Sequence, residues 1–247
     1  MEKKYKLTEE TINVGGTALY RIEALRDFGD VKKGDKGGFI EKEGNLSQSD
    51  NCWVYGNAKV CDKAMVYNNA KVYDNVMVFD NAMVYGNAKV SGNAIIHEDA
   101  KVYGDAKVSG NAEVYDNGAV YGMAMVYGDT MVYENAKIYG NARVCDNVWV
   151  NCKVQVCGCA EVFGKAKICG DAVITSNSDY IVFKNWWSSG RYFTWTRSNN
   201  MWKVGCFHGT GKELIEKAYK DSEISGREYE RVVKYVESII ADDGKDK

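Results

Sequence analysis

Acid–base chemistry has few candidate side chains in this sequence, because only 2 of the 247 residues are histidines. His97 lies beside two carboxylates, Glu98 and Asp99, whereas His208 directly precedes a Gly-Thr-Gly-Lys segment. An imidazole close to a carboxylate can serve as a general base. His97 is therefore a weak catalytic candidate, although Glu98 falls at an expected corner of the chain and points away from it. Two histidines also argue against a metal site that needs three imidazole ligands.

Metal and phosphate sites have little support in the sequence. Five of the 8 cysteines lie close together without the C-x2-C pair typical of zinc sites; they are Cys145, Cys152, Cys157, Cys159 and Cys169. The Gly-Thr-Gly-Lys segment lacks the full G-x-x-x-x-G-K-S/T spacing of a phosphate-binding loop. Its residues already fit the start of a helix. We expect free thiols, no metal and no cofactor.

A six-residue repeat must position most of these groups. From Val54 to Ile174 every sixth residue is Val or Ile, and a small residue, mostly Ala, stands two positions earlier. Alternate residues of a strand face the same way, so both positions point inward. The Gly-Asn and Asp-Asn pairs between them fit turns, because Gly, Asn and Asp tolerate positive φ. Three hexads make one triangular coil, and the repeat predicts about seven coils, roughly 34 Å long at ~4.8 Å per coil.

The aliphatic-x-x-x-small-x pattern resembles the hexapeptide-repeat, left-handed β-helix family over about residues 46–178. The Tyr-Gly-Asn-Ala units, entered through the segment GGFIEKEGNLSQSDNCWVYGNA, resemble bacterial and phage-borne proteins of mostly unassigned function. The resemblance implies a mainly β fold, and the best-known family members are trimeric acyltransferases with a His general base. Those enzymes insert a loop that covers the cleft between subunits, whereas the six-residue register is unbroken here. Catalysis therefore does not follow from the fold.

The flanking segments predict two further domains around a β-helix at residues 51–179. Residues 1–50 are expected to cap the first coil with a hairpin that turns at Gly15-Gly16, followed by a loop at 29–38. Residues 180–247 are expected to form a small α+β domain with a three-stranded meander, Tyr180–Trp187, Arg191–Arg197 and Met201–Phe207. Two capping boxes, at Thr210 and Ser225, predict two helices after it.

Stacking the hexads in steps of 18 residues predicts columns of outward side chains. One column is an aromatic ladder of Tyr67, Tyr85, Tyr103, Tyr121 and Tyr139. A second face is basic and bordered by rings; it carries Lys71, Lys89, Lys107 and Arg143 beside Tyr73 and Tyr127. Charge and stacking of this kind could hold a nucleotide, single-stranded nucleic acid or a small anion. The alternative is an ordinary solvated charged face.

A third face is apolar and predicts an interface. Its residues are Met77, Ile95, Met131 and Trp149. Packing in a homotrimer is one explanation, and docking of the chain's own C-terminal helices is the other. The C-terminal domain is rich in Trp and Arg, residues enriched at binding hot spots; the candidates are Trp186, Trp187, Arg191, Trp195, Arg197 and Trp202. A domain of this size also needs aromatic residues for its core.

Composition excludes several classes of protein. Hydrophobic residues make up 45% of the chain, which is too apolar for disorder, and the net charge of -2 argues against duplex binding by overall charge. No apolar run is long enough to span a membrane and no secretory signal is evident, so we expect a cytoplasmic protein with no membrane partner.

The sequence therefore favours a non-enzymatic, oligomeric binding protein, in the form of a phage or prophage accessory protein that inhibits or sequesters a host defence component. The alternatives are an acyl-CoA-dependent acyltransferase and a nucleotide or single-strand nucleic-acid binder that uses the Tyr and Lys columns.

Overall fold

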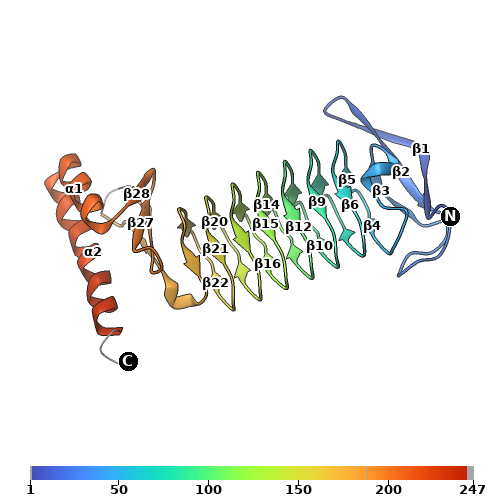
Figure 1. The fold of residues 1–247 in the computed structure, drawn as a ribbon. Coiled ribbons are helices and arrows are strands. Elements are labelled where there is room, and N and C mark those ends of the chain that lie inside the picture. The colour runs from blue at the N-terminus through green and yellow to red at the C-terminus, as the bar shows by residue number, and fades with distance from the viewer. Residues whose placement is uncertain (1, 188, 244–247) are drawn as a thin grey trace. The chain divides into compact units, whose positions relative to one another are not determined.

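The computed structural model describes residues 2–187 and 189–243 (Figure 1). The chain divides between Asn177 and Ser178 into two compact units, which we describe separately. The first unit is a parallel β-solenoid and the second is a small α+β unit. No helix in the described part of the chain is long and apolar enough to cross a membrane.

The solenoid is built from two-residue strands that stack in three parallel sheets. The first sheet contains β5 (Lys59–Val60), β8 (Met77–Val78), β11 (Ile95–Ile96), β14 (Glu113–Val114), β17 (Met131–Val132), β20 (Trp149–Val150) and β23 (Lys167–Ile168). The second contains β4 (Trp53–Val54), β7 (Lys71–Val72), β10 (Lys89–Val90), β13 (Lys107–Val108), β16 (Met125–Val126), β19 (Arg143–Val144) and β22 (Glu161–Val162). The third contains β6 (Met65–Val66), β9 (Met83–Val84), β12 (Lys101–Val102), β15 (Ala119–Val120), β18 (Lys137–Ile138), β21 (Gln155–Val156) and β24 (Val173–Ile174).

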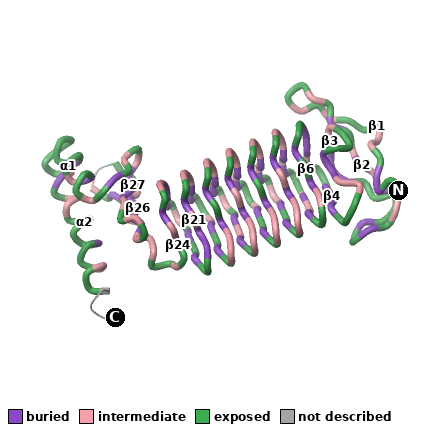
Figure 2. The backbone as a smooth tube through the Cα atoms, viewed as in Figure 1, coloured by how far each residue is buried: buried purple, intermediate pink, exposed green. Residues whose placement is uncertain are grey.

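Neighbouring strands pair in register 18 residues apart, as the repeat predicts; Lys89 lies opposite Lys71 on one side and Lys107 on the other. The aliphatic residue of each hexad is buried, and the small residue two positions earlier is buried wherever it is Ala (Figure 2). Burial of Val, Ile and Ala in a continuous stack stabilises coils that could not form a core singly.

An additional coil precedes the seven that the repeat predicts. Ile40 pairs in parallel with Val60, and Leu46 forms a bridge with Val66. These offsets are 20 residues rather than 18, because eight residues instead of six separate Leu46 from Val54. Because of the two extra residues, this coil does not follow the strict six-residue period of the repeat.

The N-terminal segment continues the first sheet. Strands β1 (Tyr5–Val14) and β2 (Thr17–Ala24) form the expected hairpin; β2 pairs with β3 (Lys36–Ile40), which lies parallel to β5. Residues 36–38 are therefore in a strand and not in the expected loop. A short 3-10 helix, η1 (Glu43–Asn45), follows β3. The buried Lys4 Nζ donates to the Cys52 carbonyl at 2.9 Å and lies 3.2 Å from its Sγ, which fastens the segment to the first coils.

The C-terminal unit begins with η2 (Asn177–Asp179) and an antiparallel sheet of β25 (Tyr180–Lys184), β26 (Tyr192–Thr196), β27 (Met201–Val204) and β28 (Phe207–Gly209). Four strands replace the expected three, because a turn at Gly205-Cys206 divides the predicted third strand. Gly205 has φ +56, a conformation that favours glycine.

Two helices complete this unit. The capping box at Thr210 opens α1 (Gly211–Asp221) as predicted: the Thr210 amide donates to Glu213 Oε2 at 2.8 Å. Helix α2 (Glu223–Asp243) begins before the box predicted at Ser225, because the Ser222 hydroxyl accepts the Ser225 amide at 3.1 Å. Both helices contribute to the unit's core, which comprises Phe193, Trp195, Trp202, Val204, Leu214, Val233 and Val236.

Candidate functional sites

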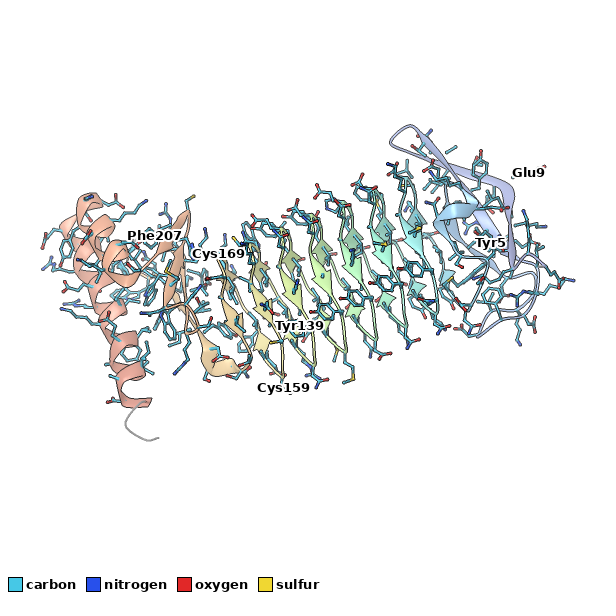
Figure 3. The ribbon with its side chains drawn as sticks, viewed as in Figure 1. Tyr5, Glu9, Tyr139, Cys159, Cys169 and Phe207 are labelled. Atoms are coloured by element: carbon cyan, nitrogen blue, oxygen red, sulfur yellow. The ribbon has the colours of Figure 1, made fainter. Side chains whose placement is uncertain are left out.

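The tyrosine ladder forms as the column analysis predicts. Successive rings from Tyr67 to Tyr139 lie 4.8–5.0 Å apart between centroids and are nearly parallel; Tyr139 is labelled in Figure 3. The Tyr139 hydroxyl donates to Gln155 Oε1 at 3.0 Å, so the ring lies back over the next coil. A hydrogen bond with Cys157, and then burial, raises the pKa of Tyr139 to about 12. The rings of this column thus cover one another.

His97 lies within a second column of stacked rings. Its ring centroid is 4.9 Å from that of Phe79 and 5.1 Å from that of Tyr115, and the three planes are almost parallel. Nε2 lies 3.1 Å from Glu113 Oε1, and Nδ1 lies 4.0 Å from Asp80 Oδ2. Both faces of the imidazole are therefore covered, and its side chain is 17% exposed.

The carboxylate that contacts His97 is Glu113, and not Glu98 or Asp99, its neighbours in the sequence. The two residues are 16 positions apart, because the histidine reaches across to the outward position of the next coil. The contact between Tyr139 and Gln155 has the same separation. A separation of 16 residues therefore joins a ring position to the outward position before the aliphatic residue in the next coil. This separation is the signal in the sequence that points to the pair of His97 with Glu113.

The His97–Glu113 pair has the groups that a general base requires. If Nε2–H donates to Glu113, Nδ1 keeps its lone pair, since 4.0 Å to Asp80 is too long for a hydrogen bond. A carboxylate in this position fixes the tautomer and stabilises the imidazolium that forms on proton transfer.

A column of carboxylates occupies the adjacent corner of the solenoid. Each member has φ between +53 and +57; they are Asp62, Asp80, Glu98, Asp116 and Glu134. The side chain of each of the first four accepts the backbone N–H of the next member. A hydrogen bond with Asp116, and then burial, raises the pKa of Glu98. The described residues include no group of three or more His, Cys, Asp or Glu side chains arranged to hold a metal ion.

Two of the four cations of the basic face, Lys71 and Arg143, are engaged within the chain. Lys71 Nζ lies 2.6 Å from Asp30 Oδ1, which also accepts the Tyr55 hydroxyl at 2.9 Å, and the Tyr55 and Tyr73 rings stack at 4.5 Å. This cluster ties the N-terminal loop to the first coils. Arg143 pairs with Glu161 at 3.3 Å.

The middle of the basic face lacks aromatic neighbours. Lys89 and Lys107 are exposed, but serines 91 and 109 occupy the ring positions beside them. The structure therefore does not bring these lysines together with Tyr73 and Tyr127 in one continuous array.

The predicted interface on the first sheet is only partly apolar. Met77, Ile95 and Met131 are half-buried within the chain, and Glu113 lies between the last two. Trp149 is 38% exposed, with Lys167 Nζ 3.7 Å from its ring centroid.

The tryptophans of the C-terminal unit divide between core and surface. Trp195 and Trp202 are buried, so they cannot contact a partner as predicted, and Trp187 packs against the same core. Trp186 is 81% exposed. Arg197 Nε donates to the Ser178 carbonyl at 3.2 Å.

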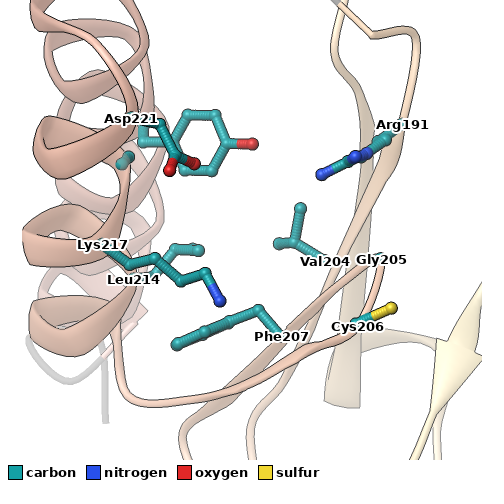
Figure 4. A pocket seen from close by; sticks show the side chains of 10 residues that line it. Arg191, Val204, Gly205, Cys206, Phe207, Leu214, Lys217 and Asp221 are labelled. Carbon is teal, nitrogen blue, oxygen red and sulfur yellow. The ribbon is translucent and has the colours of Figure 1, made fainter.

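Arg191 lines a pocket of about 300 Å³ in the C-terminal unit (Figure 4). The other lining residues are Val204, Gly205, Cys206, Phe207, Leu214, Lys217, Ala218, Asp221 and Tyr229. The sequence pointed to Arg191 but not to the helix residues opposite it. Leu214, Lys217 and Asp221 have the spacing of one helix face, which places all three beside the pocket.

Comparison with known proteins supports the solenoid. A family model described as the YdcK Beta solenoid repeat matches residues 136–151. The chain is also 41% identical over 61 residues to a protein of Escherichia coli (strain K12) named "Uncharacterized acetyltransferase YdcK". That match covers 22% of this chain and 19% of the relative. With the solenoid, these matches confirm the resemblance to hexapeptide-repeat β-helix proteins.

Proposed function

We propose that this chain is a non-enzymatic, oligomeric binding protein whose C-terminal unit recognises the partner. The observation that carries the proposal is the exposure of Trp186, at 81%, in a unit whose other tryptophans contribute to the core. A tryptophan left in water is a typical hot-spot residue. The resemblance to phage-borne proteins suggests sequestration of a host defence component as the finer form of this role.

Recognition is tested by comparing three proteins as immobilised baits. These are the full chain, the chain ending at Asn177, and the full chain carrying Trp186→Ser. A partner captured by the full chain should be lost with the shortened chain and bind the Trp186→Ser variant with a loss of about 2 kcal/mol or more. Ile224→Ser, at another exposed apolar residue of the unit, is the matched control. Equal capture by the shortened chain would assign recognition to the solenoid.

Assembly is proposed to use the first sheet, around Met131 and Trp149. The double variant Met131→Glu, Trp149→Glu should convert the oligomer, which we expect to be a trimer, into monomers. Light scattering at micromolar concentration measures the molecular mass of the wild type and of the variant. A wild-type chain that is monomeric under these conditions would contradict the proposal.

Acyl transfer is the second candidate function, favoured by the His97–Glu113 pair and by the name of the E. coli relative. The pair would accept a proton from a hydroxyl or amine that attacks the acyl thioester. Thiol release from acetyl-CoA with a panel of amines and sugars tests this directly. Turnover that is lost in His97→Ala and Glu113→Gln but kept in Asp80→Asn would establish the enzyme and displace the binding proposal.

A further inference from the structure

The pocket of the C-terminal unit has an apolar floor and charged walls. Val204 and Phe207 from the sheet face Leu214 from α1 (Figure 4). Tyr229 from α2 also lines the pocket. The Tyr229 ring is fixed by an edge-to-face contact with Phe193, with centroids 4.6 Å apart. A volume of about 300 Å³ lies at the lower end of the range for small-molecule sites.

Three charged side chains surround this floor. Arg191 lies across the Gly205 turn, and Lys217 and Asp221 are one helical turn apart on α1. Lys217 Nζ is 5.9 Å from the centroid of the Phe207 ring. Among the described residues, none of these three charges has an ion-pair partner within 4.0 Å.

Some of the charges elsewhere on the same two helices are paired. Arg231 lies 2.6 Å from Glu228, and Lys234 lies 2.6 Å from Glu230. At the pocket, by contrast, two cations and one carboxylate line the same cavity, and no ion pair within 4.0 Å engages any of them among the described residues. Asp221 is also in the last turn of α1, where the helix dipole disfavours a negative charge. These features indicate a site arranged for a bound group.

We propose that this pocket binds a small organic monoanion, a carboxylate with an aromatic or branched apolar body. Arg191 and Lys217, on opposite walls, would each donate to the carboxylate. Hydrogen bonds between charged groups are stronger than those between neutral groups. The apolar body would lie on Val204, Leu214 and Phe207. Asp221 brings the net charge of the lining to +1, which matches one negative charge better than two. Trp186 does not line the pocket, so this inference is independent of the proposed partner surface.

The test uses the full chain and three probes of similar size, namely 3-phenylpropionate, its neutral amide and phenyl phosphate. Isothermal titration and ligand-observed NMR should show saturable binding of 3-phenylpropionate with a Kd on the order of 0.1–1 mM, as suits an open pocket and a small ligand. The amide should bind at least about tenfold more weakly, because it cannot accept charge-assisted hydrogen bonds as a carboxylate does.

Two substitutions locate the site. Arg191→Gln and Lys217→Gln should each raise the Kd by about tenfold, the usual range for a hydrogen bond to a charged group. Lys220→Gln is the matched control, since Lys220 is an exposed lysine on the same helix that does not line the pocket. All three positions are exposed, so the variants should keep the wild-type Tm, and this is checked first.

Three results with the probes would overturn the proposal. They are no saturable binding of 3-phenylpropionate up to roughly 10 mM, equal binding of the amide, and tighter binding of phenyl phosphate. An equal effect of Lys220→Gln and Lys217→Gln would also overturn it, by showing that only general surface charge acts. Because none of these measurements depends on Trp186, failure here leaves the test of partner recognition unaffected.

Discussion

The solenoid and the C-terminal unit use their polar side chains in different ways. On the solenoid, a group that points outward meets its own equivalent in the next coil. Tyrosine rings stack at 4.8 Å, Asn75 donates to Asn93, and Asp80 accepts the Glu98 amide. Repetition therefore satisfies the surface from within the chain. The sequence of the C-terminal unit does not repeat, and the charges around its pocket have no ion-pair partner in the part of the chain that the structure describes.

This difference explains where ligand chemistry can be sought. A column of identical groups is stabilised by its neighbours, and a ligand would have to displace those contacts. His97 illustrates the point, because its ring is covered on both faces and Nε2 is engaged by Glu113. Among the described residues Arg191 and Lys217 have no ion-pair partner, so a bound anion would not have to displace one.

The largest effect is expected from a core substitution in the C-terminal unit. Trp202→Ala should cost about 3–5 kcal/mol, which approaches the whole stability of so small a unit. Residues 178–243 should then lose protection in hydrogen exchange while the solenoid strands keep theirs, since solenoid stability is a sum over neighbouring coils. Trp186→Ala is the control and should change stability by less than about 0.5 kcal/mol. Loss of protection in both units would show that they unfold as one.

A smaller effect is expected at the solenoid corners. Gly104 has φ +71, and a Cβ there would lie 3.0 Å from the Gly122 nitrogen in the next coil. Gly164 has φ +77, but a Cβ there would meet nothing within 4 Å. Gly104→Ala should therefore cost about 2–3 kcal/mol and Gly164→Ala about 1 kcal/mol, the left-handed strain alone. Thermal denaturation measures both, and equal losses would mean that the close stacking of corners contributes nothing.

The sequence predicted the parts of the molecule that its periodicity controls. Register, the buried Val and Ile stack and the Tyr67–Tyr139 ladder follow from a period of 18, because in-register coils repeat every contact. The extra coil at Ile40 and Leu46 was missed since two inserted residues break that period. The pair of His97 with Glu113 was missed because it joins two different columns. The pocket could not be foreseen, since it depends on how α1 packs against β27 and β28, which no local pattern specifies.

The smallest effect concerns the carboxylate column, where repetition brings together like charges. The Glu98 carboxylate lies beside Asp116, and its pKa is raised, chiefly by a hydrogen bond with the Asp116 carboxyl, whereas the charge of His97 acts to lower it. A carboxyl whose pKa is higher in the folded state binds protons more tightly there than in the unfolded chain. Its stabilising contribution is present below the usual pKa of about 4.3 and is lost as the pH rises through the raised value.

Glu98→Gln should therefore raise the Tm slightly at pH 7, and this gain should vanish near pH 4. Glu9→Gln is the control, because Glu9 is an exposed residue of β1 outside the carboxylate column. It measures how the removal of any one negative charge changes the Tm. A Glu98→Gln variant that is less stable than the wild type at pH 7 would contradict this. It would mean that the hydrogen bonds from backbone N–H groups to the carboxylates stabilise the corner by more than the repulsion between the carboxylates destabilises it.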